Sequence, residues 1–362
     1  MTDRELFEKT FSALHASPDT LSEVKRTMQN EKKTRRILGR GAVIAIAAAL
    51  TLTVAVAAGV VTLIKADVSP ADKVDDTTHH AFTDDLDDTA PVVDDGKGGL
   101  VTVPDMERIP GGVQTTQRLV GPYLSKLDAE MTVGASTITL GTFLIDENGL
   151  GLLTYSVEDP NGVGYTDVGY GESIDLPIQP TLTMRAPGAE GVSVIRRCHV
   201  DTAAGTDTSL QVVVYFAANK DFRQGDLLYV TMEDEAGQPY SIAVQPRTYV
   251  PVSTLAAGDD TLTVSPLGIS IRNPHPDREL LIDELSLRYQ DGSDFTLEST
   301  GRNLMNWVVG YMRSSDDAPF ADNVYVFNRL VDVDAIASVT LEGHQFDGVS
   351  PDAEALTLTY LP

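Results

Sequence analysis

Residues 138–157 read ITLGTFLIDENGLGLLTYSV. Two apolar runs in this stretch flank the four residues Asp146-Glu147-Asn148-Gly149. Asn-Gly between two apolar runs is a strong local signal for a hairpin, because both residues tolerate the positive φ angles of a tight turn. The segment therefore predicts two antiparallel strands joined by a turn.

Short apolar runs continue through the rest of the chain, separated by Gly, Pro, Asn and Asp, and Asp291-Gly292 repeats the hairpin signal. Short strands without a long helical pattern are typical of antiparallel sandwiches. We expect a mainly β fold with two extracellular antiparallel β-sandwich (immunoglobulin-like) domains, at 127–250 and 251–362. The other predicted strands are Thr181–Arg185, Val192–Val200, Leu210–Phe216, Leu227–Met232, Ser241–Gln245, Leu262–Ile271, Leu280–Tyr289, Phe295–Leu297, Asn306–Met312, Val324–Phe327, Ala337–Leu341 and Ala355–Tyr360.

The run from Ala42 to Ile64 contains no charged residue. As a helix rising ~1.5 Å per residue it would be about 35 Å long, enough to cross a ~30 Å hydrocarbon core. We therefore expect one transmembrane helix at 41–65. A cleaved signal peptide, with Ala55-Val56-Ala57 as its site, fits less well because a long polar segment precedes the run and the run exceeds a signal-peptide core. A buried soluble helix is the third interpretation.

The flanks of this run predict its orientation. The preceding segment is strongly basic, whereas acidic residues, beginning with Asp67, outnumber basic ones after it. Positive charge stays on the cytoplasmic side, so we expect a single-pass cell-membrane protein with its N-terminus in the cytoplasm and its C-terminal domains extracellular. The residues expected to set this topology are Lys32, Lys33, Arg35, Arg36 and Arg40.

The predicted cytoplasmic tail, residues 1–40, reads as two short helices that each carry an apolar stripe. Ser17-Pro18-Asp19 between them is typical of a helix start. Two such helices cannot form a stable core alone, so we expect the stripes to dock a cytoplasmic protein. The alternative is a simple juxtamembrane anchor. The candidate partner-binding residues are Phe7, Phe11, Leu14, Leu21, Val24 and Met28.

The first part of the range 66–126 is rich in Asp, Pro and Gly and poor in aromatic residues. This composition predicts an acidic disordered tether. His79-His80 lies among aspartates and suggests a metal site, but the spacing matches no compact site, so we interpret it as solvated linker.

Composition restricts the function further. The formal net charge is −26 although the tail is basic, so the outer region is strongly acidic and nucleic acid is not an expected partner. The single cysteine, Cys198, forms no intramolecular disulfide and alternates with apolar residues as a buried strand thiol would. Trp307 is expected in a sandwich core, with a ligand-stacking role as the alternative. No catalytic motif is present, so we expect no enzyme, no metal and no cofactor.

Three parts of the chain resemble a known family. They are similar to parts of single-pass membrane proteins from Firmicutes. The first part is the segment 11–21 with the basic cluster and the Ala-rich run after it. The second is the hairpin at 138–157, and the third is the segment 263–270 with the later Asp291-Gly292. The resemblance implies an anti-sigma-factor-like cytoplasmic tail and uncharacterised immunoglobulin-like outer domains. The tail lacks cysteine, which excludes the zinc-binding form of such a tail.

Two functions follow as expectations. The first is a membrane regulator whose outer sandwiches sense an extracellular ligand, still unknown, and whose tail holds a cytoplasmic protein such as an extracytoplasmic-function sigma factor. The second is a cell-surface binding or structural module that the tail only anchors in membrane lipid. The apolar stripes of the tail favour the first.

Overall fold

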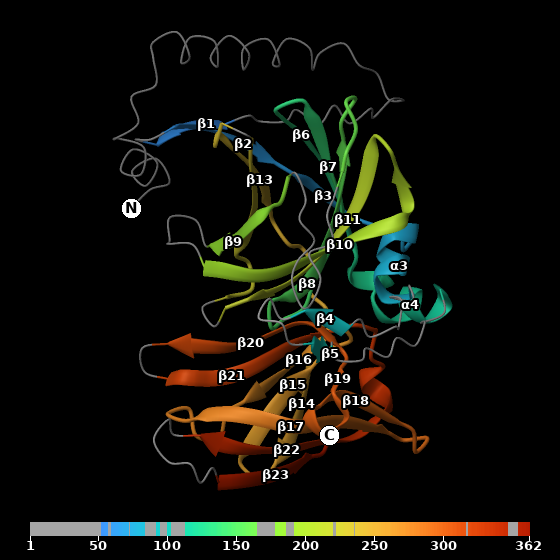
Figure 1. Cartoon of the computed structure of the whole chain (residues 1–362), viewed down its shortest axis with the longest axis vertical. Helices are drawn as coiled ribbons and strands as arrows, with labels where there is room; N and C mark the ends of the chain where they lie inside the picture. Colours follow the sequence, from blue (N-terminus) through green and yellow to red (C-terminus); the bar gives the residue numbers. More distant parts are fainter. Residues whose placement is uncertain are drawn as a thin grey trace, which may run out of the picture.

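The structure is a computed structural model that describes residues 52–56, 59–71, 73–83, 92–94, 100–102, 113–164, 178–185, 192–219, 222–234, 236–315, 318–346 and 354–362. Strands dominate these residues and nearly all pair antiparallel, so the predicted mainly β fold is confirmed. Two strand-rich units lie one above the other along the long axis, and the helices lie on one side (Figure 1).

The first unit is an eleven-stranded sheet in the order β1-β2-β13-β12-β9-β10-β11-β8-β7-β6-β3. Among its described strands, β2 and β13 alone pair in parallel. The strands are β1 (Leu52–Val56), β2 (Gly59–Lys65), β3 (Asp67–Pro70), β6 (Ser125–Val133), β7 (Ser136–Ile145), β8 (Leu150–Glu158), β9 (Thr181–Arg185), β10 (Val192–Thr206), β11 (Ser209–Ala218), β12 (Leu227–Glu233) and β13 (Pro239–Val244).

This sheet folds back on itself at β10. The first residues of β10, Val192 and Ser193, pair with β9, while Val194–Asp201 pair with β11. One hydrophobic core then collects side chains from both halves, including Ile138 on β7 and Val230 on β12. The first unit is therefore a two-layered sandwich built from one continuous sheet.

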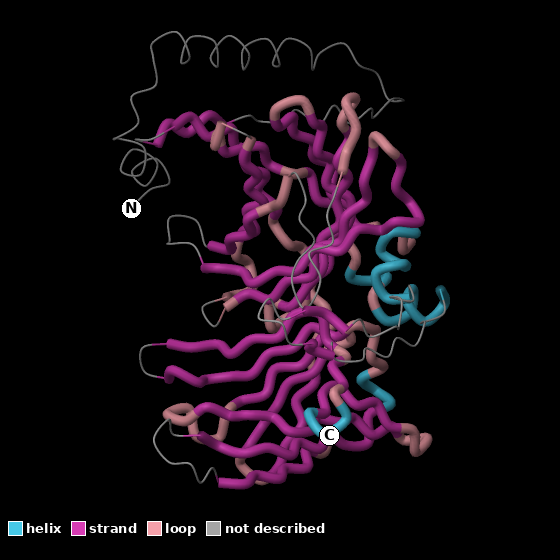
Figure 2. The backbone as a smooth tube through the Cα atoms, viewed as in Figure 1, coloured by secondary structure: helices cyan, strands magenta, loops and turns pink. Residues whose placement is uncertain are grey.

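The second unit consists of two five-stranded sheets, β14-β15-β16-β21-β20 and β19-β18-β17-β22-β23, that share a second core. Figure 2 shows that strands make up most of its described backbone. The strands are β14 (Ser253–Ala257), β15 (Asp260–Val264), β16 (Gly268–Arg272), β17 (Glu279–Tyr289), β18 (Asp294–Ser299), β19 (Leu304–Met305), β20 (Trp307–Ser315), β21 (Ala318–Phe327), β22 (Ile336–Phe346) and β23 (Glu354–Tyr360).

Both predicted hairpins are confirmed. β7 pairs with β8 across the turn at 146–149, where Gly149 has φ +80°. β17 pairs with β18 across the turn that contains Gly292, with φ +86°. Glycine suits both positions because a side chain would be strained at positive φ.

A third core joins the two units. β8 and β11 are buried on both faces along most of their length, whereas β6 alternates strictly between buried and exposed residues. The second face of β8 and β11 packs against β20 and β21, with Leu152 and Val213 in the same cluster as Val308 and Val324. Because both faces of β8 and β11 are buried, their sequences are apolar at successive positions and do not alternate between apolar and polar residues.

The described part of the predicted transmembrane helix at 41–65 differs from the prediction. Leu52–Val56 and Gly59–Lys65 form strands β1 and β2, and residues 41–51, 57 and 58 lie outside the described residues. Valine and threonine are frequent in both strands, and such residues favour extended backbone. Each strand is a piece of the run with the five to seven residues typical of a strand. No helix within the described residues is both long and apolar enough to cross a membrane.

The disordered tether predicted at 66–126 is wrong for the described part of that range. β3 pairs with β6, and two short helices, α3 (Asp76–Thr83) and α4 (Val113–Leu119), lie against the first unit. The prediction rested on average composition, whereas a few buried side chains are enough to pack this segment against the first unit. Thr78 and Ala81 are two of them, and both are almost fully buried. The remaining short elements are β4 (Val92–Asp94), β5 (Leu100–Thr102), η1 (Gly121–Tyr123), η2 (Thr300–Arg302) and η3 (Val333–Ala335).

Candidate functional site

The partner-binding residues predicted in the tail lie outside the described residues, as do the five basic residues expected to set the topology. Both predictions therefore stay predictions. The candidate site that the structure offers lies elsewhere, at one end of the second sandwich.

A cavity of about 470 Å³ opens at this end of the second unit. The tight turn between β14 and β15, with Gly258 at φ +65°, carries two of its aspartates, and Arg272 on β16 lies opposite Asp322 on β21. Its size falls within the ~300–1,000 Å³ range of small-ligand sites. The lining residues are Asp259, Asp260, Arg272, Asn273, Pro274, Pro276, Ala321 and Asp322.

Three buried amide side chains tie the two sheets together at this end. Gln345 Nε2 donates to Asn273 Oδ1 at 2.6 Å, Asn273 Nδ2 donates to Arg278 O at 2.7 Å, and Asn323 Nδ2 donates to Leu280 O at 3.0 Å. The bonds of Gln345 and Asn323 link the two sheets and the bond to Arg278 closes the loop between β16 and β17, so together they hold the cavity wall where Asn273 lines it. The amide oxygens of Asn323 and Gln345 are buried and accept no hydrogen bond from any described residue.

The charge of the cavity restricts what it can bind. Three aspartates face one arginine in its lining, so it favours a neutral or cationic ligand that donates hydrogen bonds over an anion. Within the described residues no group of three or more His, Cys, Asp or Glu side chains could hold a metal ion. The lining places hydrogen-bonding groups at the end of a sheet.

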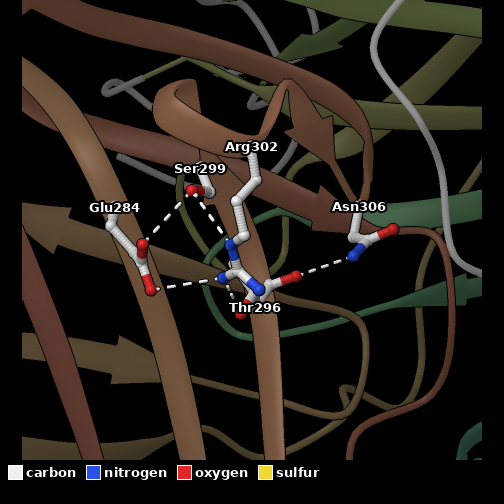
Figure 3. A network of polar contacts seen from close by, with 5 residues as sticks. All are labelled: Glu284, Thr296, Ser299, Arg302 and Asn306. Carbon is white, nitrogen blue, oxygen red and sulfur yellow. Dashed lines mark hydrogen bonds and ion pairs between the residues drawn. The ribbon is translucent and has the colours of Figure 1, made fainter.

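A second polar network lies on β17 and β18. Figure 3 shows Arg302 reaching toward Glu284, Ser299 and Thr296. Arg302 Nη2 lies 3.2 Å from Glu284 Oε1 and 2.6 Å from Thr296 Oγ1, and Asn306 Nδ2 donates to Thr296 O at 2.7 Å. Since Glu284 and Arg302 are about half exposed, their ion pair contributes little to stability. The network fixes the η2 turn.

Trp307, predicted in a sandwich core, is partly buried and lies against the second core. Its ring packs against that core and lies 5.6 Å from the ring of Tyr325. Glu298 lies beside both, and burial raises the pKa of its carboxyl group. Glu298 Oε2 and Trp307 Nε1 are buried, and neither has a hydrogen-bond partner in the part of the chain that the structure describes.

Two further predictions have an outcome in the structure. Cys198 is buried in β10, as expected, and burial raises the pKa of its thiol. His80, interpreted as solvated linker, instead lies on α3 with Nδ1 2.9 Å from Oδ2 of the buried Asp201. This contact helps to dock α3 on the first sandwich.

Sequence reasoning did not single out the cavity residues. Asp259 and Asp260 follow a glycine in a turn, but nothing local places them near Arg272 or Asp322, because sheet pairing brings these segments together. Comparison with models of known protein families gives no match, and a search of curated proteins gives none. The function is therefore argued from the residues of this chain.

Proposed function

We propose that the chain is a single-pass membrane regulator of the anti-sigma-factor-like kind. Its tail lies in the cytoplasm and docks a cytoplasmic protein, with an extracytoplasmic-function sigma factor as the class suggested by the resemblance. Its sandwiches lie outside and sense an extracellular ligand. The apolar run with a basic segment before it and acids after it supports the membrane topology.

The observation that carries the proposal is how directly the chain passes from the apolar run into the first sandwich. β2 pairs with β13 in one layer, Ala66 N donates to Ala243 O at 2.9 Å, and β3 then pairs with β6 in the other layer. One layer thus holds the end of the apolar run, in β2, and the other holds β3, which follows it. A displacement of the sandwich is therefore transmitted directly to the apolar run, because no flexible segment separates them in the part of the chain that the structure describes. A sensor requires such a direct connection, whereas a surface-binding domain needs only a tether.

The proposed membrane helix and strands β1 and β2 draw on the same residues. A helix from Ala42 to Ala58 would span about 25 Å at ~1.5 Å per residue, at the short end of what a bilayer accepts. It would leave β2 in the sheet and remove only β1, an edge strand whose one neighbour is β2. The proposal therefore places the membrane boundary near Gly59.

Protease added to intact protoplasts tests the orientation. With an epitope tag at each end of the full chain, we expect the C-terminal tag to be lost and the N-terminal tag to be protected. Detergent-permeabilised protoplasts, in which both tags should be lost, are the control. A protected C-terminal tag on intact protoplasts would refute the proposed topology.

Docking is tested by recovering the full chain from native membranes with its bound cytoplasmic proteins. Burying a phenylalanine is worth ~2–3 kcal/mol, so Phe11→Ala should weaken a true interface about tenfold or more. Ser12→Ala, one residue after it and off the apolar stripe, is the matched control. If no protein is enriched over the Phe7→Ala/Phe11→Ala double variant, the tail is only an anchor.

A cell-surface binding module is the second candidate, and the cavity in the second sandwich favours it. This module requires the cavity but no docking by the tail. Binding of the intact protein to soluble cell-wall saccharides, compared with that of Asp260→Asn and Arg272→Ala variants, separates the two. Binding that both variants lose, together with an inert tail, would favour the surface module.

A further inference from the structure

The joint between the two sandwiches contains a buried carboxyl group. Asp146, in the turn between β7 and β8, has 0% of its surface exposed. Its Oδ1 accepts hydrogen bonds from Asn148 N at 2.9 Å and Leu150 N at 2.8 Å, within its own turn. Its Oδ2 accepts a hydrogen bond from Ser265 Oγ at 2.7 Å, across the joint. One carboxyl group thus connects a turn of the first unit to the turn between β15 and β16 of the second.

Ser265 is itself held in place by the second unit. Its Oγ accepts hydrogen bonds from Leu267 N at 3.0 Å and Gly268 N at 3.3 Å. The hydroxyl group therefore points at Asp146 from a fixed position. Loosening the joint separates these groups.

The positive charge that acts on this carboxyl group, that of Arg313, is hydrogen-bonded to backbone carbonyl groups. Arg313 on β20, only 7% exposed, donates from Nε to Ala218 O at 3.0 Å and from Nη2 to Asn148 O at 2.7 Å. Among the described residues Asp146 has no ion-pair partner within 4 Å, so its charge is buried with hydrogen bonds alone. Burying an ionised carboxylate without a direct counter-ion is costly.

We propose that the Asp146–Ser265 contact is a pH-sensitive joint, which holds the two sandwiches together more firmly when the Asp146 carboxyl group is protonated. The proposal goes beyond the proposed function and does not depend on it. In the protonated form the carboxyl group keeps its place beside Ser265 and carries no charge. The burial penalty on the charge is then absent.

The electrostatics agree with this geometry. Burial raises the pKa of Asp146 to about 6, while Ser265, the backbone N–H groups of Leu150 and Asn148, and the charge of Arg313 oppose the shift. Of the charged groups around the joint, Arg313 faces Asp146 from β20, and the carboxylate of Glu147, in the same turn, accepts a hydrogen bond from Val252 N.

The sign of the effect follows from linkage. The pKa of Asp146 is higher in the folded state than its ordinary 3.8, so the folded state binds the proton more tightly. The stabilisation is fully present below about pH 4 and is lost as the pH rises through about 6. Between pH 5 and pH 7.5 the unfolding equilibrium constant should therefore rise about tenfold on account of Asp146 alone.

The test is urea unfolding of the full chain in detergent micelles at pH 5 and pH 7.5, followed by the fluorescence of Trp307, the single tryptophan. Unfolding of the second unit uncovers Asp146. The unfolding equilibrium constant at pH 7.5 divided by that at pH 5 gives a ratio for each protein. This ratio should be about tenfold larger in the wild type than in Asp146→Asn. Equal ratios in the two proteins would overturn the proposal.

Asp159→Asn is the matched control, because Asp159 begins the same Asp-x-Asn-Gly pattern and bonds Asn161 N and Ser136 Oγ. Its pKa is lowered by those bonds, so it does not titrate between pH 5 and 7.5, and the wild-type ratio should remain. Ser265→Ala is an independent variant if Asp146→Asn does not fold. This variant removes a hydrogen-bond donor that stabilises the ionised Asp146 carboxylate, so the pKa of Asp146 and the ratio of unfolding constants should both increase. An unchanged or smaller ratio contradicts the proposal.

Discussion

The replacement Gly268→Ala tests how closely β16 and β21 approach each other at the joint. An added Cβ would lie 2.3 Å from Tyr325 O and 2.6 Å from Leu150 Cδ1. Ordinary non-bonded contacts between heavy atoms are about 3.5 Å or more, so the backbone oxygen would have to move by roughly 1 Å. That movement stretches the antiparallel pair Gly268–Val326. The leucine can rotate away, but the carbonyl group belongs to the strand.

We expect a loss of about 1–3 kcal/mol in the free energy of unfolding, the usual cost of overpacking. Urea unfolding followed by Trp307 reports on the second sandwich, because the tryptophan packs against its core. With a slope of about 1–3 kcal/mol/M, the midpoint should fall by roughly 1 M. Gly301→Ala is the control, since nothing lies within 4 Å of its added Cβ. A Gly268→Ala midpoint equal to that of the control would refute the steric argument.

Three further outcomes follow from the structure. Asp75→Ala removes the acceptor for Thr78 N at 2.8 Å that caps α3, so the cap should lose about 0.5–2 kcal/mol, and hydrogen exchange should accelerate in residues 76–83 but not in β17. Cys198 should react with a maleimide only after unfolding, because burial both shields its thiol and raises the pKa; labelling of the folded chain would contradict this. Burial raises the pKa of Glu298 above its ordinary 4.5, so this group stabilises the fold below about pH 4.5 and loses that stabilisation as the pH rises through its raised pKa. Glu298→Gln should accordingly gain stability relative to the wild type between pH 4 and pH 7 in urea titrations, and a constant difference would exclude this effect.

The mainly β character and the two hairpin turns could be predicted because their causes are local. Gly149 and Gly292 adopt positive φ within turns whose bonds join residues two to four positions apart. Alternation along β6 likewise depends on one buried and one exposed face. Such features depend on a few adjacent residues, so the local sequence pattern is sufficient to predict them.

Residues 52–83 could not be predicted in the same way. The apolar run fits a helix or a strand by its own pattern, and the partner that makes β2 a strand, β13, lies far along the chain. The acidic segment that follows contains α3, which is held by contacts such as Tyr215 Oη to Ala81 O at 2.5 Å. Average composition says nothing about a distant tyrosine.

The sequence by itself determined the strand content, the turns and the charge asymmetry around the apolar run, since each depends on neighbouring residues. Only the tertiary structure decided which aspartates matter. Asp146 reads as a turn residue, yet it is fully buried because the second sandwich covers it, while Asp159 in the same local pattern carries an ordinary hydrogen-bonded carboxylate. Desolvation depends on what packs against a group, and that is fixed by segments more than a hundred residues away.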